Sequence, residues 1–282
     1  MDFPRLLASH GVASLPPQRV ERERGSFEAT IEIAPGRAAT VRVHADGDDA
    51  CVAVAGPMLG AATRQRLLAT VARMLALDED LSGFYARCRN DDTLSWASTG
   101  AGRMLRSPTV FEDAVKTICT TNCAWSATVR MVTSLVEHLG TRAPDGRAAF
   151  PSAQAMASAG PSFYREVVRA GYRARYLRAL AEEVAAERVD LEALRDPSLS
   201  DTEVTRALLA LPGIGPYAAA HIMLVALGRY RRLVLDSWTR PTYARLAGGT
   251  LSDARITERF QRFGPYAGLA FWLVVTKEWV SG

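Results

Sequence analysis

The sequence predicts an α+β fold, with a small N-terminal antiparallel β-sheet domain over residues 1–60 and a mainly α-helical body over residues 61–282. Two patterns lead to this fold class. Between Ser26 and Gly56, apolar residues alternate with polar ones, which is the period of half-buried strands. Beyond about residue 60, apolar residues recur at i, i+3, i+4 and i+7, which is the period of amphipathic helices. At 282 residues and 48% hydrophobic composition, the chain is long and apolar enough to bury a core in each part.

Three strands are expected in the N-terminal part. Their apolar positions are, in chain order, Phe27, Ala29, Ile31 and Ile33, then Val41 and Val43, then Val52 and Val54. Two segments of turn composition, Ala34-Pro35-Gly36-Arg37 and Asp46-Gly47-Asp48-Asp49, separate the strands. Because the turns are short, the sequence predicts an antiparallel meander. Further along, helices are expected around Leu67–Leu75 and Leu177–Val184, and glycines and prolines divide the rest of the body into helices of ordinary length.

The composition excludes several classes of protein. The longest apolar run, Leu269 to Val275, is too short to cross a bilayer, and the first residues lack the features of a secretory signal. We therefore expect a soluble, cytoplasmic protein with no membrane partner. The four cysteines are unevenly spaced without a paired CxxC, which argues against zinc and iron–sulfur sites and favours buried thiols; no cofactor is expected to be required. The net charge of +4 permits an anionic partner without demanding one.

A helix-hairpin-helix is predicted between residues 200 and 225. Ser200-Asp201-Thr202-Glu203 has the pattern of a capping box that opens a helix through Leu209, and a second helix begins near Pro216. The turn between them, Leu211-Pro212-Gly213-Ile214-Gly215, can expose its backbone amides, and the second helix adds its positive N-terminal end. Such a hairpin suits a phosphate oxygen. A plain turn between two helices is an equally good reading of these residues alone.

Asp236 follows Gly215 by 21 residues and lies between an apolar Leu233-Val234-Leu235 and a new helix. An aspartate at a helix start is commonly an N-cap. An ionised carboxylate that faces a cleft can also stabilise a cationic transition state or activate water. The two roles are compatible, because a helix N-terminus favours the ionised form of the carboxyl group.

With hairpin and aspartate at this spacing, the sequence resembles the helix-hairpin-helix DNA glycosylase superfamily. Other segments are similar, in order, to those of the 8-oxoguanine DNA glycosylases: Gly102–Arg106, Phe111-Glu112, Ile118-Cys119, Phe150–Ser152, Gly171–Tyr176 and Gly264–Gly268. The resemblance runs from about residue 60 to the end. It implies two helical sub-domains with the active-site cleft between them, after an N-terminal sheet. It also implies a base excision repair enzyme, expected to be a monomer associated with the bacterial nucleoid, that acts on double-stranded DNA containing a damaged base.

The family's catalytic lysine is missing. In 8-oxoguanine glycosylases the second residue after the last glycine of the hairpin turn is a lysine that attacks the sugar as a Schiff-base nucleophile, and here that residue is Tyr217. Lys116 and Lys277 are the only lysines among the 34 basic residues, and neither occupies that place. A phenol cannot form an imine. We therefore expect a monofunctional glycosylase, in which water displaces the base with the help of Asp236 and the strand is left uncut.

The predicted base pocket also departs from the oxidised-guanine enzymes. The position of their base-reading glutamine is taken by Phe271, with Trp272 beside it, so hydrogen-bond readout is lost there. Tyr217 and His221 lie at i and i+4 on the second helix of the hairpin, and the family's alkylpurine glycosylases are similar in having aromatic residues at these places. An aromatic wall attracts positively charged, N-alkylated purines. These rings could instead be ordinary core, and Trp125 could line the pocket or belong to the core.

The resemblance further implies how DNA would be held. Asn122, in Thr120-Thr121-Asn122-Cys123, is expected to fill the gap that an everted nucleotide leaves in the duplex, although it could equally be a helix cap. The backbone of Leu211, Gly213, Ile214 and Gly215 would contact phosphate, together with the side chain of Arg240. The backbone carbonyls of Leu209, Leu211 and Ile214 would hold a monovalent cation, either sodium or potassium.

Three functions remain open from the sequence. The first is a monofunctional DNA N-glycosylase for an N-alkylated purine. The second is an 8-oxoguanine-type glycosylase with altered catalysis, since much of the chain is similar to that family. The third is a non-catalytic module that binds damaged DNA.

Overall fold

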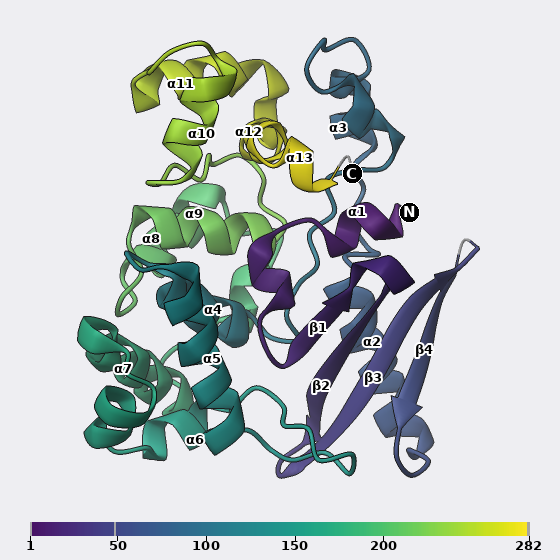
Figure 1. Cartoon of the computed structure of the whole chain (residues 1–282), viewed down its shortest axis with the longest axis vertical. Coiled ribbons are helices and arrows are strands. Elements are labelled where there is room, and N and C mark those ends of the chain that lie inside the picture. Colours follow the sequence, from purple (N-terminus) through teal and green to yellow (C-terminus); the bar gives the residue numbers. More distant parts are fainter. Residues whose placement is uncertain (1, 48, 281–282) are drawn as a thin grey trace.

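The computed structural model describes residues 2–47 and 49–280, and they form the predicted α+β architecture. Figure 1 shows the sheet along one side of the molecule and most of the helices stacked on the other. Within the described residues, no helix combines the length and the apolar composition that a membrane span requires.

The sheet is an antiparallel meander of four strands in the order β1-β2-β3-β4. Their bounds are Gln18–Glu21, Ser26–Ala34, Arg37–Asp46 and Asp49–Ala55. The last three are the predicted strands, and their order and direction are confirmed; Asp48 of the second turn lies outside the described residues. The sequence did not predict β1. This strand has four residues of which only Val20 is apolar, so it carries almost no periodic signal.

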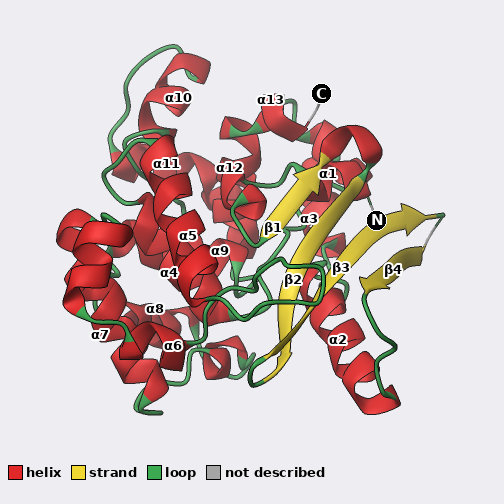
Figure 2. Ribbon diagram, turned by 60° about the horizontal axis from the view of Figure 1, so that its bottom comes forward, coloured by secondary structure: helices red, strands yellow, loops and turns green. Residues whose placement is uncertain are grey.

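One face of the sheet packs against two helices, α1 (Phe3–Leu7) and α2 (Ala61–Met74). Phe27 and Val41 from the sheet share a core with Leu6, Leu67 and Val71 from these helices, and all five side chains are almost fully buried. Figure 2 shows α2 lying along the sheet. The proposed boundary near residue 60 thus falls between β4 and a helix that completes the core of the sheet; the boundary itself stays a prediction.

The remaining helices build the body. They are α3 (Ser82–Cys88), α4 (Val110–Thr120), α5 (Trp125–Leu139), α6 (Ala153–Ser158), α7 (Ala174–Ala185), α8 (Asp201–Leu209), α9 (Pro216–Val225), α10 (Thr239–Leu246), α11 (Asp253–Phe260), α12 (Ala267–Val275) and α13 (Lys277–Val280). One apolar core is formed by side chains of the helices from α4 through α9. A second is formed by side chains of α3 and of the helices from α9 through α12. Helix α9 contributes to both, which explains why it is apolar on all sides.

The expectation that all four cysteines are buried is wrong for two of them. Cys88 and Cys119 are buried, but Cys51 and Cys123 are only partly buried. Cys51 lies on β4, which is at the edge of the sheet and pairs with β3. All four are free thiols.

Candidate active site

The hairpin forms as predicted. Ser200 and Glu203 make a full capping box, α8 ends at Leu209 and α9 begins at Pro216. Gly213 has a φ of +78°, and a Cβ atom there would lie 2.7 Å from Tyr176 Cβ, so only glycine fits. Gly215 is the N-cap of α9 and supplies no side-chain cap, which leaves the first amides of this helix without a side-chain acceptor.

A cavity of about 1070 Å³ opens beside the hairpin. Segments far apart in the sequence line it, including the residues around Gly11, the loop after α4, the start of α9 and the end of the chain. It brings together most of the predicted site residues: Asn122, Trp125, Gly213, Gly215, Tyr217, His221, Asp236, Arg240 and Trp272. Leu209, Leu211, Ile214 and Phe271 do not line it. The side chains of Leu211 and Ile214 pack toward the helical core, so only their backbone could meet a phosphate.

Asp236 combines the two roles that its position in the sequence allows. Its Oδ1 atom accepts hydrogen bonds from the backbone amides of Trp238 (2.9 Å) and Thr239 (2.6 Å), and its own amide donates to Thr239 Oγ1 (2.8 Å). Its Oδ2 atom accepts no hydrogen bond from the described residues. The nearby Arg240 is paired with Asp253 through two 2.8 Å contacts. One carboxylate oxygen therefore holds the start of α10, while the other is left for a ligand in the cavity.

Tyr217 projects from the first turn of α9 into the same cavity. Its hydroxyl lies 3.1 Å from Thr120 Oγ1. Burial raises the pKa of this phenol, and the negative charge of Asp236 acts in the same direction. The side chain is thus a neutral ring beside a carboxylate.

His221 lies one turn further along α9, with its ring 5.9 Å from that of Tyr217. It is buried, and its Nδ1 atom is 3.2 Å from Thr117 Oγ1 on α4. Burial lowers the pKa of His221 to about 4. The ring of His10 stands edge-on behind it at 6.2 Å; burial, together with the neighbouring His221, lowers the pKa of His10 to about 3.

These two histidines should make the protein less stable in mild acid. In the unfolded chain both histidines bind protons below about pH 6.5. In the folded protein, His221 stays neutral until the pH falls to about 4, and His10 until it falls to about 3. Acid therefore favours unfolding, by about 2 kcal/mol for each histidine between pH 7 and pH 5. Urea unfolding of wild type and of His10→Gln at both pH values measures the effect, and the variant should lose about 2 kcal/mol less.

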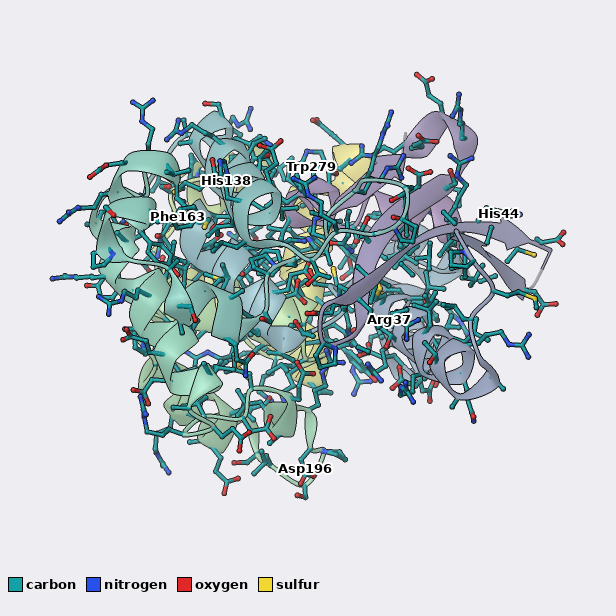
Figure 3. All side chains as sticks on the ribbon, turned by 90° about the horizontal axis from the view of Figure 1, so that it is seen from below. Arg37, His44, His138, Phe163, Asp196 and Trp279 are labelled. Atoms are coloured by element: carbon teal, nitrogen blue, oxygen red, sulfur yellow. The ribbon has the colours of Figure 1, made fainter. Side chains whose placement is uncertain are left out.

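The comparison with a variant is necessary because other buried groups act oppositely. Burial raises the pKa of Glu112 and Asp113, so these carboxyl groups bind protons more readily in the folded state and resist acid. His138→Gln is the matched control, since His138 is exposed on α5 (Figure 3). An equal pH response in His10→Gln and His138→Gln would contradict a neutral, buried His10.

Aromatic rings continue the cavity wall from His221. Trp272 lies 6.0 Å from His221, and its indole nitrogen donates to the carbonyl of Ser9 (2.9 Å). Two further tryptophans were not predicted: Trp238, directly after the Asp236-Ser237 pair, and Trp279 on α13 (labelled in Figure 3). Their rings stack at 4.9 Å and are 38% and 36% exposed. Large apolar rings left this open beside a cavity are suited to a flat ligand.

The expectation that Phe271 lines the pocket is wrong. Its side chain is 0% exposed, and its ring packs 5.4 Å from Phe260 and 5.6 Å from Tyr243 in the core. Neighbouring residues of an α-helix point about 100° apart, and of these two side chains only that of Trp272 lines the cavity. Trp272 takes that direction.

Asn122 lies in the loop between α4 and α5, exposed and with a φ of +46°. It caps neither helix, because Thr121 is the C-cap residue of α4 and Ala124 is the N-cap residue of α5. Its Nδ2 atom is 3.3 Å from the hydroxyl of Tyr172, which is half exposed at the edge of the cavity and was not predicted. Trp125, also half exposed, lies at the same edge against Gly11.

Of the carbonyls proposed to hold a cation, that of Leu209 belongs to the last residue of α8, and those of Leu211 and Ile214 belong to the turn. The Leu211 carbonyl accepts the Ile214 amide at 3.3 Å, which leaves one lone pair for a cation. Among the described residues, no three His, Cys, Asp or Glu side chains are grouped to hold a metal ion.

No family model matches the chain. Several solved structures share its fold. A 3-methyladenine DNA glycosylase from Archaeoglobus fulgidus has a TM-score of 0.77 at 21% identity, over 99% of this chain and 96% of its own. An 8-oxoguanine glycosylase/lyase from Clostridium acetobutylicum has a TM-score of 0.71 at 20% identity, over 95% and 93%. A 3-methyladenine DNA glycosylase from Schizosaccharomyces pombe, bound to abasic DNA, has a TM-score of 0.54 at 16% identity, over 70% and 95%. The predicted likeness to these glycosylases is confirmed for the fold.

Proposed function

We propose that this chain is a monofunctional DNA N-glycosylase, which everts an N-alkylated purine and hydrolyses its glycosidic bond with the help of Asp236. The observation that carries the proposal is the free Oδ2 atom of Asp236, held between the hairpin and an aromatic wall. The shared fold with two 3-methyladenine glycosylases supports it.

The aromatic wall suits a positively charged base. Tyr217, Trp272, Trp238 and Trp279 border the cavity, and His221 adds a neutral ring. A cation over an aromatic face gains on the order of 0.5 to 2 kcal/mol. Alkylation at N3 or N7 gives a purine this charge, whereas an undamaged purine is neutral.

Asp236 would act on the sugar. As the bond between C1′ and the base breaks, the electron pair goes to the base, which leaves as a neutral molecule. Positive charge then develops on the sugar, where the carboxylate stabilises it. Water adds to C1′ and gives up a proton, so the products are a free base and an intact strand with an abasic site.

The absence of a suitable amine supports a hydrolytic reaction. Among the residues that the structure describes, neither Lys116 nor Lys277 lines the cavity. Lys116 is fully buried in an ion pair with Glu112 (2.7 Å). Lys277, in the described part of α13, is also outside the lining.

DNA would be held from several sides of the cavity. The amides at the start of α9 would meet a phosphate, with the turn's carbonyls holding a monovalent cation. Asn122 and Tyr172, linked to each other, would fill the space of the everted nucleotide. The guanidinium of Arg240 is already paired with Asp253, so it would bind a phosphate while also keeping or giving up that ion pair. The expected form is a monomer on double-stranded DNA.

A panel of duplexes, each with one lesion, tests the proposal. Duplexes containing a 3- or 7-alkylpurine should give free base and alkali-labile sites, with no break before alkali treatment. The fold shared with 8-oxoguanine enzymes keeps that lesion as the second candidate. Release of 8-oxoguanine alone would replace the alkylpurine assignment, and tight binding without release from any duplex would indicate a non-catalytic module.

Tyr217→Lys is expected to add strand-nicking activity, because it places an amine beside Asp236 at the entrance of the cavity. Burial there lowers the pKa of an amine and favours its nucleophilic form, whereas the charge of Asp236 acts in the opposite direction. Borohydride should trap a covalent DNA adduct with this variant, and none with wild type or the control Tyr217→Phe. If folded Tyr217→Lys binds lesion DNA without forming an adduct, position 217 does not reach C1′.

A further inference from the structure

His221 has two ring nitrogens, of which the protein uses one. Nδ1 pairs with Thr117, whereas Nε2 makes no hydrogen bond with any described residue. His221 is buried but borders the cavity, so Nε2 is the ring nitrogen that the side chain can present to a ligand there. A polar atom on an otherwise aromatic wall is a candidate for recognising a ligand, since its direction fixes how a base can lie.

The Thr117 hydroxyl decides which nitrogen of His221 carries the proton. Thr117 is buried, and His221 Nδ1 is the only hydrogen-bond partner of its hydroxyl among the described residues. If Nδ1 carried the proton, the hydroxyl proton would be buried without an acceptor, which costs free energy. The hydroxyl therefore donates to Nδ1, and Nε2 carries a proton that it can donate into the cavity.

The surroundings keep this ring uncharged and fixed. His10 packs edge-on against it, and the Nε2 atom of His10 donates to the carbonyl of Leu105 (2.7 Å). Burial lowers the pKa of both histidines, to about 3 for His10 and about 4 for His221. Tyr217, whose ring neighbours His221, is a neutral phenol, and the other titratable residues that line the cavity are Asp236, Arg22, Arg240, Cys123, Tyr172 and Tyr176.

We propose that His221 selects the everted base by donating a hydrogen bond from Nε2 to an unsubstituted ring nitrogen of the purine, and that Thr117 fixes this direction. The inference rests on the proposed function and narrows the substrate to purines that keep an unsubstituted ring nitrogen as an acceptor at this edge. A purine alkylated at N3 keeps N7 as an acceptor, and one alkylated at N7 keeps N3. 8-Oxoguanine carries a proton on N7, so at that edge its N7–H and the Nε2–H of His221 would both be donors and could not form a hydrogen bond.

The proton position can be measured without any reaction. The chain has four histidines, so ¹⁵N spectra of its imidazoles can be assigned with single His→Gln variants. Wild type and Thr117→Ser should carry the proton on Nε2 of His221 and show an Nδ1 resonance shifted by an accepted hydrogen bond, and Thr117→Val should lose this shift. A proton on Nδ1 in wild type, or an unchanged spectrum in Thr117→Val, would overturn the inference.

Free bases identify the acceptor. Adenine, 3-deazaadenine and 7-deazaadenine are titrated at millimolar concentration while His221 Nε2 is observed. Adenine and one analogue should shift the resonance, and the analogue that lacks the acceptor should not. Equal shifts from all three, or none from any, would show that Nε2 does not read a ring nitrogen.

Base release gives the second readout. On an alkylpurine duplex, His221→Leu and Thr117→Val should lower kcat/KM by about tenfold or more, while Thr117→Ser stays close to wild type. Equal losses in Thr117→Ser and Thr117→Val would contradict a role of the hydroxyl. If wild type releases no base from any lesion, the proposed function fails, whereas the spectra and titrations still decide the inference.

Discussion

Asp236→Asn is expected to slow the release of an alkylated base by about a thousandfold, because it removes the negative charge that faces the sugar. The fold should be unaffected. Oδ1 of Asp236 accepts two backbone amides at the start of α10, and the amide oxygen of asparagine can accept the same two bonds. Single-turnover release from an alkylpurine duplex measures the chemical step, and affinity for the same duplex should stay within a few-fold of wild type.

Asp236→Ala separates the two roles of this side chain. It should be as inactive as Asp236→Asn, and in addition less stable by about 1 kcal/mol, because the helix loses its cap. If Asp236→Asn released base at the wild-type rate while binding DNA normally, the carboxylate would be a helix cap alone.

Lys116→Met is expected to destabilise the protein by about 3 to 5 kcal/mol. The ammonium group is 0% exposed and contacts Glu112 Oε1 (2.7 Å), Gln18 Oε1 (3.0 Å) and Ser107 Oγ (3.3 Å). Without it, the carboxyl group of Glu112 would be buried with no counter-ion. Since burial already raises the pKa of Glu112, lowering the pH should reduce the penalty by protonating that group.

Removing both partners should restore most of the stability. The double variant Glu112→Leu/Lys116→Met removes both charges of the ion pair, and the remaining loss comes from the neighbouring buried Asp113, which also interacts with Lys116. Arg188→Met is the surface control: Arg188 also pairs with a glutamate, Glu183 (2.9 Å), but it is exposed, and its loss should change stability little. Urea unfolding measures all three. An equally small effect in Lys116→Met and Arg188→Met would mean that water reaches the buried pair.

Much of the fold could be predicted from local signals. The strand pattern from Phe27 onward, the Ser200–Glu203 capping box and the Gly213 turn each act over a few residues, and the structure has all of them. Strand β1 could not be predicted, because it is short and polar and is held by pairing with β2. The packing of α2 on the sheet likewise depends on contacts between distant residues.

Site residues could be predicted where they lie on one helix or at a fixed distance along the sequence. Tyr217 and His221 share a face of α9, and Asp236 follows at a characteristic distance. Phe271 was misplaced because a sequence alignment does not fix which face of α12 meets the cavity. Tyr172 and Trp279 reach the cavity only through tertiary packing, and the N-terminal segment around His10 does so from the opposite end of the chain. Trp238 was the one missed residue with a local signal, since it follows Asp236 by two positions.

Binding of two abasic-site analogues tests the central claim most directly. A pyrrolidine analogue carries a positive charge where charge develops on the sugar, and a tetrahydrofuran analogue of the same shape is neutral. If the Asp236 carboxylate faces that sugar, wild type should bind the charged duplex at least about a hundredfold more tightly than the neutral one, and Asp236→Asn should lose most of this preference. Equal affinity of wild type for both duplexes, or a preference that survives in Asp236→Asn, would contradict the account.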